Sequence, residues 1–167
     1  MNVKWLRRIK VTAEPTMTKD ETSKYSDLQP NGRAKLFTFP MDVKSVITSP
    51  SGMQTMRGPG LYQISGVAWS GFGRVRRVEI SADGGKTFAQ AALDGPVLPL
   101  ALTRFRMPWR WDGGPSVLMS RAVDETGAVQ PTRAVLIGTR GTAYRYHYNA
   151  IQSWSVAQGG AVSNVYV

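Results

Sequence analysis

The fold of this chain is decided by residues 76–88, which read RRVEISADGGKTF. Val78 and Ile80 alternate with charged neighbours, and this period of two is typical of a strand with one buried face. We expect Val78 and Ile80 to face a core and Glu79 to face water. The Asp-Gly-Gly at residues 83–85 favours a tight turn, because glycine tolerates positive φ. The stretch therefore predicts a strand that enters a β-hairpin.

From residue 34 onward the chain repeats this pattern of short strands separated by turn residues. No stretch of about ten residues has a 3.6-residue period, so little helix is expected. Further strands are expected at residues 36–39, 43–48, 61–69, 102–107, 117–123 and 134–138. About seven short strands in one domain predict an all-β fold, an immunoglobulin-like (E-set) β-sandwich.

The first 33 residues have a different character. Residues 5–11, WLRRIKV, suggest a short strand, whereas residues 12–33 are polar, contain two prolines and show almost no period. A structureless stretch of this length is uncommon inside a compact domain. We therefore expect residues 1–33 to form an extended N-terminal arm across a neighbouring domain or subunit. The sandwich, with a C-terminal extension, is expected over residues 34–167.

The residue inventory leaves little room for catalysis within the chain. There is no cysteine, so thiolate chemistry, disulfides and Cys-based metal sites are excluded. The single histidine, His147, lies among tyrosines and is expected to be packed or hydrogen-bonded rather than to act as a base. The acidic residues are scattered. We expect no catalytic residue and no metal ligand here.

Localisation signals are also missing from the sequence. No apolar run approaches the ~20 residues that a membrane helix requires. Residues 1–8, MNVKWLRR, lack the apolar segment of a signal peptide. A membrane partner is therefore not expected.

The formal net charge of +10 attracts anionic partners: nucleic acid, acidic lipid, an anionic substrate or an acidic protein. Trp109 and Trp111, with Arg104 and Arg106 nearby, suit a surface that stacks bases and binds phosphate. Burial of these tryptophans in the core is the favoured interpretation. Residues 81–88 fit an Asp-box hairpin, a structural device in which the aromatic residue plugs the core, and we assign it no ligand.

Residues 69–74, WSGFGR, carry the most distinctive local pattern. Two glycines around one aromatic residue predict a bend that brings the backbone close to a neighbour. Arg74 stands at the exit of this bend. Its guanidinium offers a fixed fork of donors that matches planar or tetrahedral oxyanions. The bend is therefore a candidate anion-binding site.

Several of these runs together resemble one family, the sulfite-oxidase-type molybdenum enzymes. Residues 3–6, VKWL, are similar to the stretch where the family's molybdopterin domain ends. Residues 66–74, GVAWSGFGR, resemble the opening of its dimerisation domain, and residues 78–88 resemble the hairpin that follows. Within the family, further runs resemble the molybdenum subunits of sulfane dehydrogenases of bacterial sulfur oxidation; they lie at residues 23–28, 102–106, 108–114 and 148–154.

The resemblance implies a periplasmic oxidoreductase that moves electrons from a reduced sulfur compound through a molybdopterin (Mo) centre to a c-type cytochrome. The family's molybdenum is held by a Cys of the preceding domain, and this sequence has no Cys. We therefore expect the dimerisation domain, or a fragment, of a sulfite or sulfane dehydrogenase, inactive alone. Its expected partners are a second copy, the missing molybdopterin domain and the cytochrome.

The resemblance also assigns site residues position by position. Asn2, Val3 and Lys4 match the stretch that contacts the phosphate of the pterin cofactor. Arg74 matches an arginine that the dimerisation domain contributes to the pocket for the anionic sulfur substrate. Its role would be to bind and orient that substrate rather than to transfer protons.

One alternative from a different functional class stays open. A stand-alone β-sandwich that binds carbohydrate or nucleic acid would explain the Asp-box hairpin, the tryptophans and the basic charge. The VKWL start and the bend before Arg74 favour the first hypothesis, because a free binding module needs neither, so a nucleic-acid partner is disfavoured.

Overall fold

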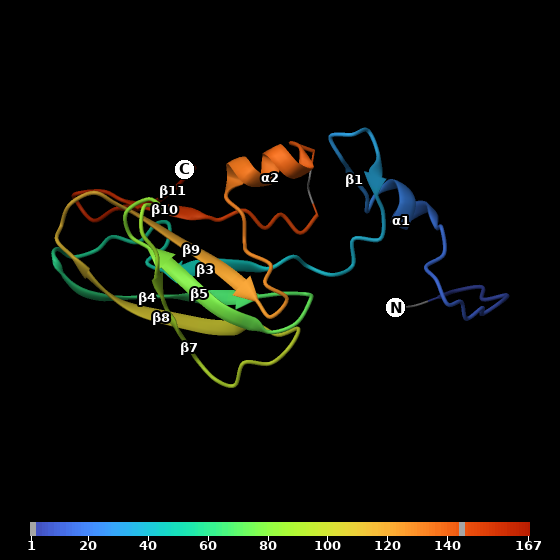
Figure 1. Ribbon diagram of the computed structural model, residues 1–167, viewed down its shortest axis with the longest axis horizontal. Helices are drawn as coiled ribbons and strands as arrows, with labels where there is room; N and C mark the ends of the chain where they lie inside the picture. The colour runs from blue at the N-terminus through green and yellow to red at the C-terminus, as the bar shows by residue number, and fades with distance from the viewer. Residues whose placement is uncertain (1–2, 144–145) are drawn as a thin grey trace.

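The structure, a computed structural model, describes residues 3–143 and 146–167. Two antiparallel sheets pack face to face (Figure 1), and the predicted immunoglobulin-like sandwich is confirmed. One sheet has the strand order β11-β10-β9-β5-β6 and the other β3-β4-β8-β7. The larger strands are β3 (Lys44–Ser49), β4 (Gly60–Trp69), β5 (Val75–Ser81), β8 (Thr103–Trp111), β9 (Ser116–Asp124), β10 (Ser153–Val156) and β11 (Val162–Val165). The short strands are β6 (Ala89–Gln90) and β7 (Ala92–Leu93).

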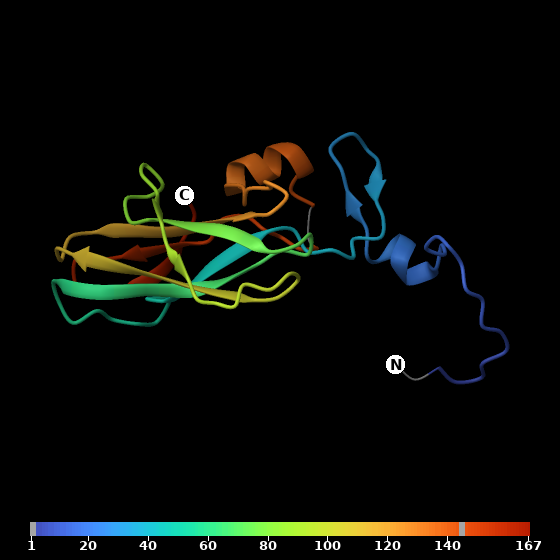
Figure 2. The same cartoon turned by 60° about the horizontal axis from the view of Figure 1, so that its bottom comes forward.

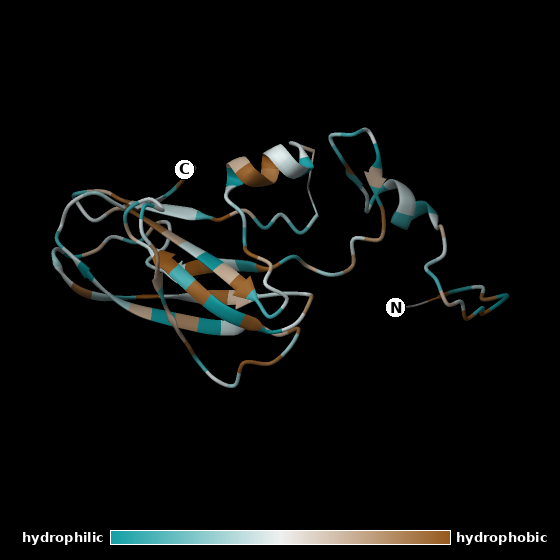
Figure 3. Cartoon of the chain, viewed as in Figure 1, coloured by the Kyte–Doolittle hydropathy of each residue, from teal (hydrophilic) through white to brown (hydrophobic). Residues whose placement is uncertain are grey.

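The core lies between the two sheets because alternate residues of each strand point inward. Val78 and Ile80 of β5 are 0% and 1% exposed, as the sequence predicts. Ile64 of β4, Phe105 of β8 and Leu118 of β9 meet them in one hydrophobic cluster. Along the strands, apolar and polar residues alternate in bands (Figure 3).

The outer face of β5 is polar, but Glu79 is largely covered. Its side chain is only 17% exposed because Arg77 and Arg121 both pair with it. The guanidinium of Arg121 also stacks on Phe88, 3.9 Å from the ring centroid. Phe88, the aromatic residue of the Asp-box hairpin, thus packs on the outside of the sheet and does not plug the core, contrary to expectation. The short hairpin brings Phe88 back over the same face that carries Arg121.

Gly66 of β4 leaves room for the ring of Phe105, its partner on β8 within the same sheet. A Cβ at Gly66 would lie 2.4 Å from Cζ of Phe105 and 2.2 Å from the carbonyl oxygen of Val46. Neither neighbour has room to retreat, since Phe105 is 1% exposed and Val46 pairs within the same sheet. The buried ring of Phe105 therefore lies directly over a residue without a side chain.

A buried glutamine joins the sheets to the C-terminal region. Gln130 is 1% exposed, and its Oε1 accepts hydrogen bonds from the amide of Ser45 (2.8 Å), the hydroxyl of Ser45 (2.7 Å) and the amide of Ala122 (3.1 Å). Its Nε2 donates to the carbonyl oxygens of Ser45 and Ala150, both at 3.3 Å. One side chain thus satisfies backbone groups of β3, β9 and the segment before β10.

The predicted strand at residues 134–138 is wrong: helix α2 spans Arg133–Arg140. Thr132 caps it by accepting a hydrogen bond from the amide of Val135 at 3.3 Å. Arg140 in its last turn pairs with Asp42 at 2.5 Å. A short apolar run does not distinguish a strand from a helix with one buried residue, here Leu136.

Other boundaries also differ from expectation. Residues 5–11 and 36–39 are not strands, and residues 108–111 continue β8 rather than forming a loop. Pro108 is tolerated within β8 because β7 pairs only with Arg106 and Phe105, which leaves that side of Pro108 without a neighbouring strand. The C-terminal residues add β10 and β11 to the five-stranded sheet.

The N-terminal arm extends away from the sandwich (Figures 1 and 2). It holds the short helix α1 (Lys19–Ser23) and strand β1 (Asp27–Leu28), which pairs with β2 (Ala34–Lys35) directly after the arm. This part contacts the sandwich through Tyr25, whose ring lies 5.3 Å from that of Tyr146. The arm exposes apolar side chains, among them Trp5 at 94% and Ile9 at 78%. No helix within residues 3–143 and 146–167 is long and apolar enough to cross a membrane.

Replacing Gly66 with alanine should lower the free energy of unfolding by about 1–3 kcal/mol, because the added methyl group overpacks the core against Phe105. Urea unfolding followed by tryptophan fluorescence measures the change. Gly138→Ala is the matched control, since a Cβ there meets no atom within 4 Å and Gly138 lies inside α2. The control should stabilise the protein by roughly 0.5–1 kcal/mol. Equal effects of the two substitutions would contradict the packing described for Gly66.

Candidate functional site

The bend between β4 and β5 brings its backbone against two neighbouring segments, as the sequence predicts. The amide of Gly71 donates to the carbonyl oxygen of Met41 at 2.7 Å. A Cβ at Gly71 would lie 2.4 Å from the backbone nitrogen of Met41. Gly73 has φ of +147°, and a Cβ there would lie 2.1 Å from Oε1 of Glu125. Close approach to backbone therefore requires a glycine at position 71, and the positive φ favours one at position 73.

Asp124, at the end of β9, fixes this bend through hydrogen bonds. Its Oδ2 accepts a hydrogen bond from the hydroxyl of Ser70 at 2.7 Å. Its Oδ1 accepts from the amide of Thr126 (3.0 Å), the hydroxyl of Thr126 (2.6 Å) and the amide of Ala128 (3.1 Å). The hydroxyl of Ser70 in turn accepts from the amide of Phe72 at 3.1 Å. One carboxylate thereby fixes both the bend and the turn at residues 124–128.

The carboxylate of Asp124 is charged despite being fully buried. Burial acts to raise its pKa, but the hydrogen bonds from Thr126, Ser70 and the amides of Ala128 and Thr126 outweigh it. The net result is a pKa below the ordinary value of 3.8. The turn is therefore built around an anion that its own donors stabilise.

The backbone of Arg74 is positioned by Glu125, the residue that follows Asp124. The amide of Arg74 donates to Oε1 of Glu125 at 3.0 Å, and the amide of Glu125 donates to the carbonyl oxygen of Arg74 at 2.9 Å. The guanidinium Nη1 lies 3.7 Å from Oε2 of Glu125, with the two side chains 54% and 45% exposed. An exposed pair of this kind contributes only about 0–1 kcal/mol. The backbone of Arg74 is thus fixed, whereas its guanidinium is free to exchange Glu125 for another anion.

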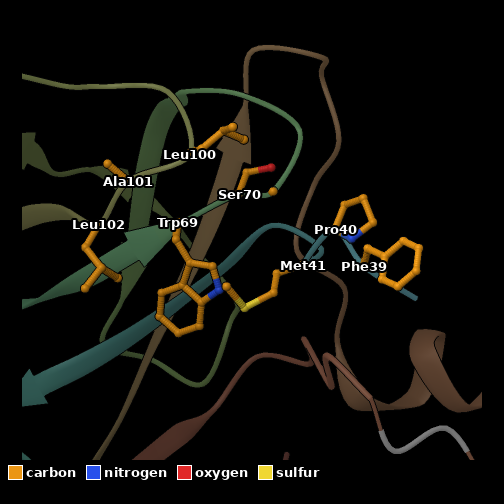
Figure 4. A pocket seen from close by; sticks show the side chains of 9 residues that line it. Phe39, Pro40, Met41, Trp69, Ser70, Leu100, Ala101 and Leu102 are labelled. Carbon is orange, nitrogen blue, oxygen red and sulfur yellow. The ribbon is translucent and has the colours of Figure 1, made fainter. Parts of the chain in front are cut away.

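A largely apolar pocket of about 540 Å³ lies beside the bend. Figure 4 shows Phe39 and Met41 coming from the segment before β3, Trp69 from the end of β4, and Leu100 and Leu102 from the loop before β8. The loop is tied to the bend by a hydrogen bond from the amide of Leu100 to the carbonyl oxygen of Gly73, 3.1 Å long. Arg74 does not line this pocket, so the apolar surface and the cation are separate features of the bend.

The N-terminal candidates lie elsewhere. Asn2 falls outside the described residues. Val3 and Lys4 are exposed in the arm, which is directed away from the sandwich (Figure 2). No hydrogen bond or ion pair among the described residues joins Lys4 to the bend. The structure therefore does not bring Val3 or Lys4 together with Arg74 within one chain.

The remaining polar and aromatic motifs have structural roles. His147 Nε2 lies 2.6 Å from the carbonyl oxygen of Thr38, the hydrogen-bonded role expected for it. Trp111 is 2% exposed in the core, and Trp109 packs against that core. In the Asp-box hairpin, Asp83 accepts from the hydroxyls of Ser81 and Thr87, at 2.7 and 2.6 Å. These hydrogen bonds lower the pKa of Asp83.

Two features that motivate a carbohydrate- or nucleic-acid-binding module are thus used within the fold: the Asp-box carboxylate and the tryptophans. No group of three or more His, Cys, Asp and Glu side chains suited to a metal ion occurs in the part of the chain that the structure describes.

The sequence singles out Arg74 as a candidate but carries no direct signal for the residues that hold its backbone. Asp124 ends β9 and Glu125 begins the turn after it, far from Arg74 in the chain. Ser70 and Asp124 are 54 positions apart, and nothing local to either residue signals their contact. A buried Asp directly after an apolar strand was the one available hint, because a buried carboxylate requires donors nearby.

Known proteins share this fold. The family described as Mo-co oxidoreductase dimerisation domain matches residues 35–153. The crystal structure of the sulfane dehydrogenase SoxCD from Paracoccus pantotrophus is similar with a TM-score of 0.87 and 52% identity, covering 90% of this chain and 39% of that chain. Human (Homo sapiens) mitochondrial sulfite oxidase is 35% identical over 118 residues, which are 66% of this chain and 21% of the relative.

Two more relatives extend the comparison. Sulfite oxidase from Gallus gallus is 30% identical over 148 residues, 78% of this chain and 31% of the relative. A nitrate reductase from Oryza sativa subsp. japonica is 34% identical over 133 residues, 65% of this chain and 14% of the relative. The chain therefore spans less than a third of the length of each of these curated relatives.

Replacing Asp124 with asparagine should lower the free energy of unfolding by about 1–3 kcal/mol at pH 7, because the bend and turn lose a charged acceptor. Since the folded pKa of Asp124 is depressed, its contribution is fully present above about pH 3.8 and is lost as the pH falls through the folded pKa. The difference in free energy of unfolding between the native protein and Asp124→Asn should therefore become smaller below about pH 4.

Urea unfolding between pH 2.5 and 7 measures this difference. Asp112→Asn is the control: Asp112 is an exposed turn residue that accepts one hydrogen bond, from the amide of Gly114, and asparagine retains that acceptor. A difference for Asp124→Asn that is the same at every pH would show that the carboxylate charge has no part in holding the bend.

Proposed function

The chain belongs to the Mo-co oxidoreductase dimerisation domain family, and we propose that it forms the homodimer of a sulfite-oxidase-type molybdenum oxidoreductase and contributes Arg74 to the pocket for an anionic sulfur substrate. The observation that carries the substrate role is Arg74 itself. Its backbone is anchored on both sides by Glu125, while its guanidinium is half exposed. A cation in this state is ready to bind a second anion.

The role proposed for Arg74 is binding and orientation. A guanidinium presents parallel N–H donors to an oxyanion and stays charged at any physiological pH. Glu125 occupies those donors weakly until an anion with better geometry replaces it. The fixed backbone keeps the fork directed at one place, which limits the orientations that a bound substrate can adopt. Proton transfer is not part of this role.

The names of the relatives support a proposal for the substrate class. The solved structure at 52% identity is named a sulfane dehydrogenase, and the curated relatives at 30% and 35% identity are named sulfite oxidases. We assign a sulfane as the substrate of the complete enzyme, sulfite being the second choice. Sulfur oxidation in the periplasm and a c-type cytochrome as electron acceptor belong to the same proposal.

Family members are molybdenum-cofactor enzymes, and the residues of this chain do not fit the metal itself. The sequence has no Cys to supply a thiolate ligand, and the described residues form no metal-binding cluster. We therefore assign the molybdenum ligand to a molybdopterin domain outside these residues.

Residues 1–33 are proposed to be the end of that molybdopterin domain and the linker that follows it, with Asn2, Val3 and Lys4 contacting the cofactor phosphate. The exposed apolar residues Trp5 and Ile9 support this, since such side chains require a partner surface. The sandwich and its C-terminal extension, residues 34–167, would then form the dimerisation domain.

The dimer is tested by light scattering on the purified chain. We expect a particle of twice the 18.3 kDa chain mass at micromolar concentration. A particle of 18.3 kDa at every concentration up to about 100 μM would contradict the proposed dimer, because a specific symmetric interface has a dissociation constant below that level.

Arg74→Gln in the complete enzyme tests the substrate role. It removes charge-assisted hydrogen bonds worth about 1.5–3 kcal/mol, so the KM for the sulfur anion should rise roughly 10- to 150-fold. Arg74→Lys keeps the charge but loses the fork of donors, so its KM should lie between those of the native enzyme and Arg74→Gln. Steady-state kinetics with the electron acceptor in excess gives KM and kcat.

Arg76→Gln is the matched control, because Arg76 is an exposed arginine on the adjoining strand. It should leave KM unchanged, and all three variants should keep the mass of the native particle. Unchanged KM in Arg74→Gln would remove Arg74 from the substrate pocket while leaving the dimer untouched.

A further inference from the structure

Three arginines form a row on the outer face of the four-stranded sheet. Arg104, Arg106 and Arg110 of β8 are all exposed, because the residues between them, Phe105 and Trp109 among them, point into the core. Two residues of a strand span about 7 Å, so Arg104 and Arg106 are close neighbours and Arg110 lies about 13 Å further along. We call these three residues the β8 arginine row.

On the opposite outer face of the sandwich, two arginines share one largely covered carboxylate. There Arg121 Nε lies 2.5 Å and Arg77 Nε 3.0 Å from the carboxylate oxygens of Glu79. In the β8 arginine row, only Arg106 is paired, with Asp94 at 3.1 Å. Within residues 3–143 and 146–167, neither Arg104 nor Arg110 forms an ion pair. One of the two outer faces thus carries an excess of positive charge that the fold does not use.

A shallow polar groove of about 410 Å³ runs beside the row. Its lining includes Arg104, Arg106 and Asp94, the carboxylate that pairs with Arg106, together with the polar side chains of Thr48, Gln63 and Ser65 on neighbouring strands. These hydroxyl and amide groups supply hydrogen bonds next to the two guanidinium groups. The groove therefore suits a carboxylate or another small anionic group better than an apolar side chain.

We propose that the β8 arginine row docks an acidic surface of a protein partner, with the partner's carboxylates in this groove. The proposal goes beyond the dimer and the role of Arg74 and depends on neither. Clustered arginines speed the encounter with an acidic protein and fix its orientation. Arg106, already held by Asp94, is oriented before the partner arrives, which reduces the entropy lost on docking.

A second copy of this chain does not fit the same face. A two-fold interface places the same patch of both copies together, so the row would face its own like charges. Single-stranded nucleic acid fits less well than protein, since single strands are held by stacking on aromatic rings. The aromatic residues of β8 face inward: Trp111 is buried in the core and Trp109 packs against it.

The test uses fluorescein-labelled poly-L-glutamate as an acidic polypeptide probe, with the full chain titrated by fluorescence anisotropy at about 50 and 300 mM NaCl. Charge reversal in the double variant Arg104→Glu/Arg110→Glu should weaken binding at least about tenfold at low salt. The double variant Arg57→Glu/Arg76→Glu is the control, with the same change in net charge at two exposed arginines off the row. It should weaken binding less than about twofold.

Equal losses of affinity in the two double variants would overturn the proposal, because net charge alone would then explain binding. Absence of binding between the native chain and the probe would also overturn it. A DNA duplex that binds as tightly as the probe and depends on the same two arginines would overturn it in favour of nucleic acid.

Light scattering on the same samples separates this inference from the proposed dimer. Loss of the dimer in Arg104→Glu/Arg110→Glu alone would make the row the interface between copies, which contradicts an acidic partner but supports dimerisation. If the charge reversal prevents folding, Arg104→Gln/Arg110→Gln replaces it and should weaken binding in the same direction by a smaller factor.

Discussion

The buried carboxylate of Asp124 is the constraint on which the candidate site depends. It has no contact with water and therefore requires donors from the protein, which it takes from Ser70 on one side and from Thr126 and Ala128 on the other. This requirement brings the end of β4 and the turn after β9 together. Glu125 follows Asp124 in the chain and therefore lies within hydrogen-bond distance of the Arg74 backbone. The exposed arginine is positioned by a buried anion that it never touches.

The surfaces of the sandwich differ in how many of their charged and aromatic side chains have partners within the fold. On the face of β5 and β9, Glu79 forms an ion pair with Arg121, and the guanidinium of Arg121 stacks on Phe88. The bend, the neighbouring apolar pocket, the β8 arginine row and the N-terminal arm remain open. A domain that works within a larger assembly is expected to look like this, because its unsatisfied surfaces are those that other parts of the assembly cover.

The strands with a clear period of two could be predicted from the sequence, and so could the bend at residues 69–74, because both signals are local. Helix α2 was missed because the apolar run at residues 134–137 fits a strand equally well, although Thr132 and Arg140 are typical helix-end residues. β10 and β11 went unpredicted because their residues mix Ser and Asn with valine. The hold of Asp124 and Glu125 on the bend could not be foreseen, because it joins residues about fifty positions apart that meet only when β5 pairs with β9.

We propose that this domain holds Arg74 ready for an anionic substrate. The most direct measurement is a crystal structure of the complete enzyme soaked with sulfite. The account predicts that the guanidinium of Arg74 leaves Glu125 for the bound anion, while the hydrogen bond between Ser70 and Asp124 is retained. An anion bound elsewhere, with Arg74 still on Glu125, would contradict it.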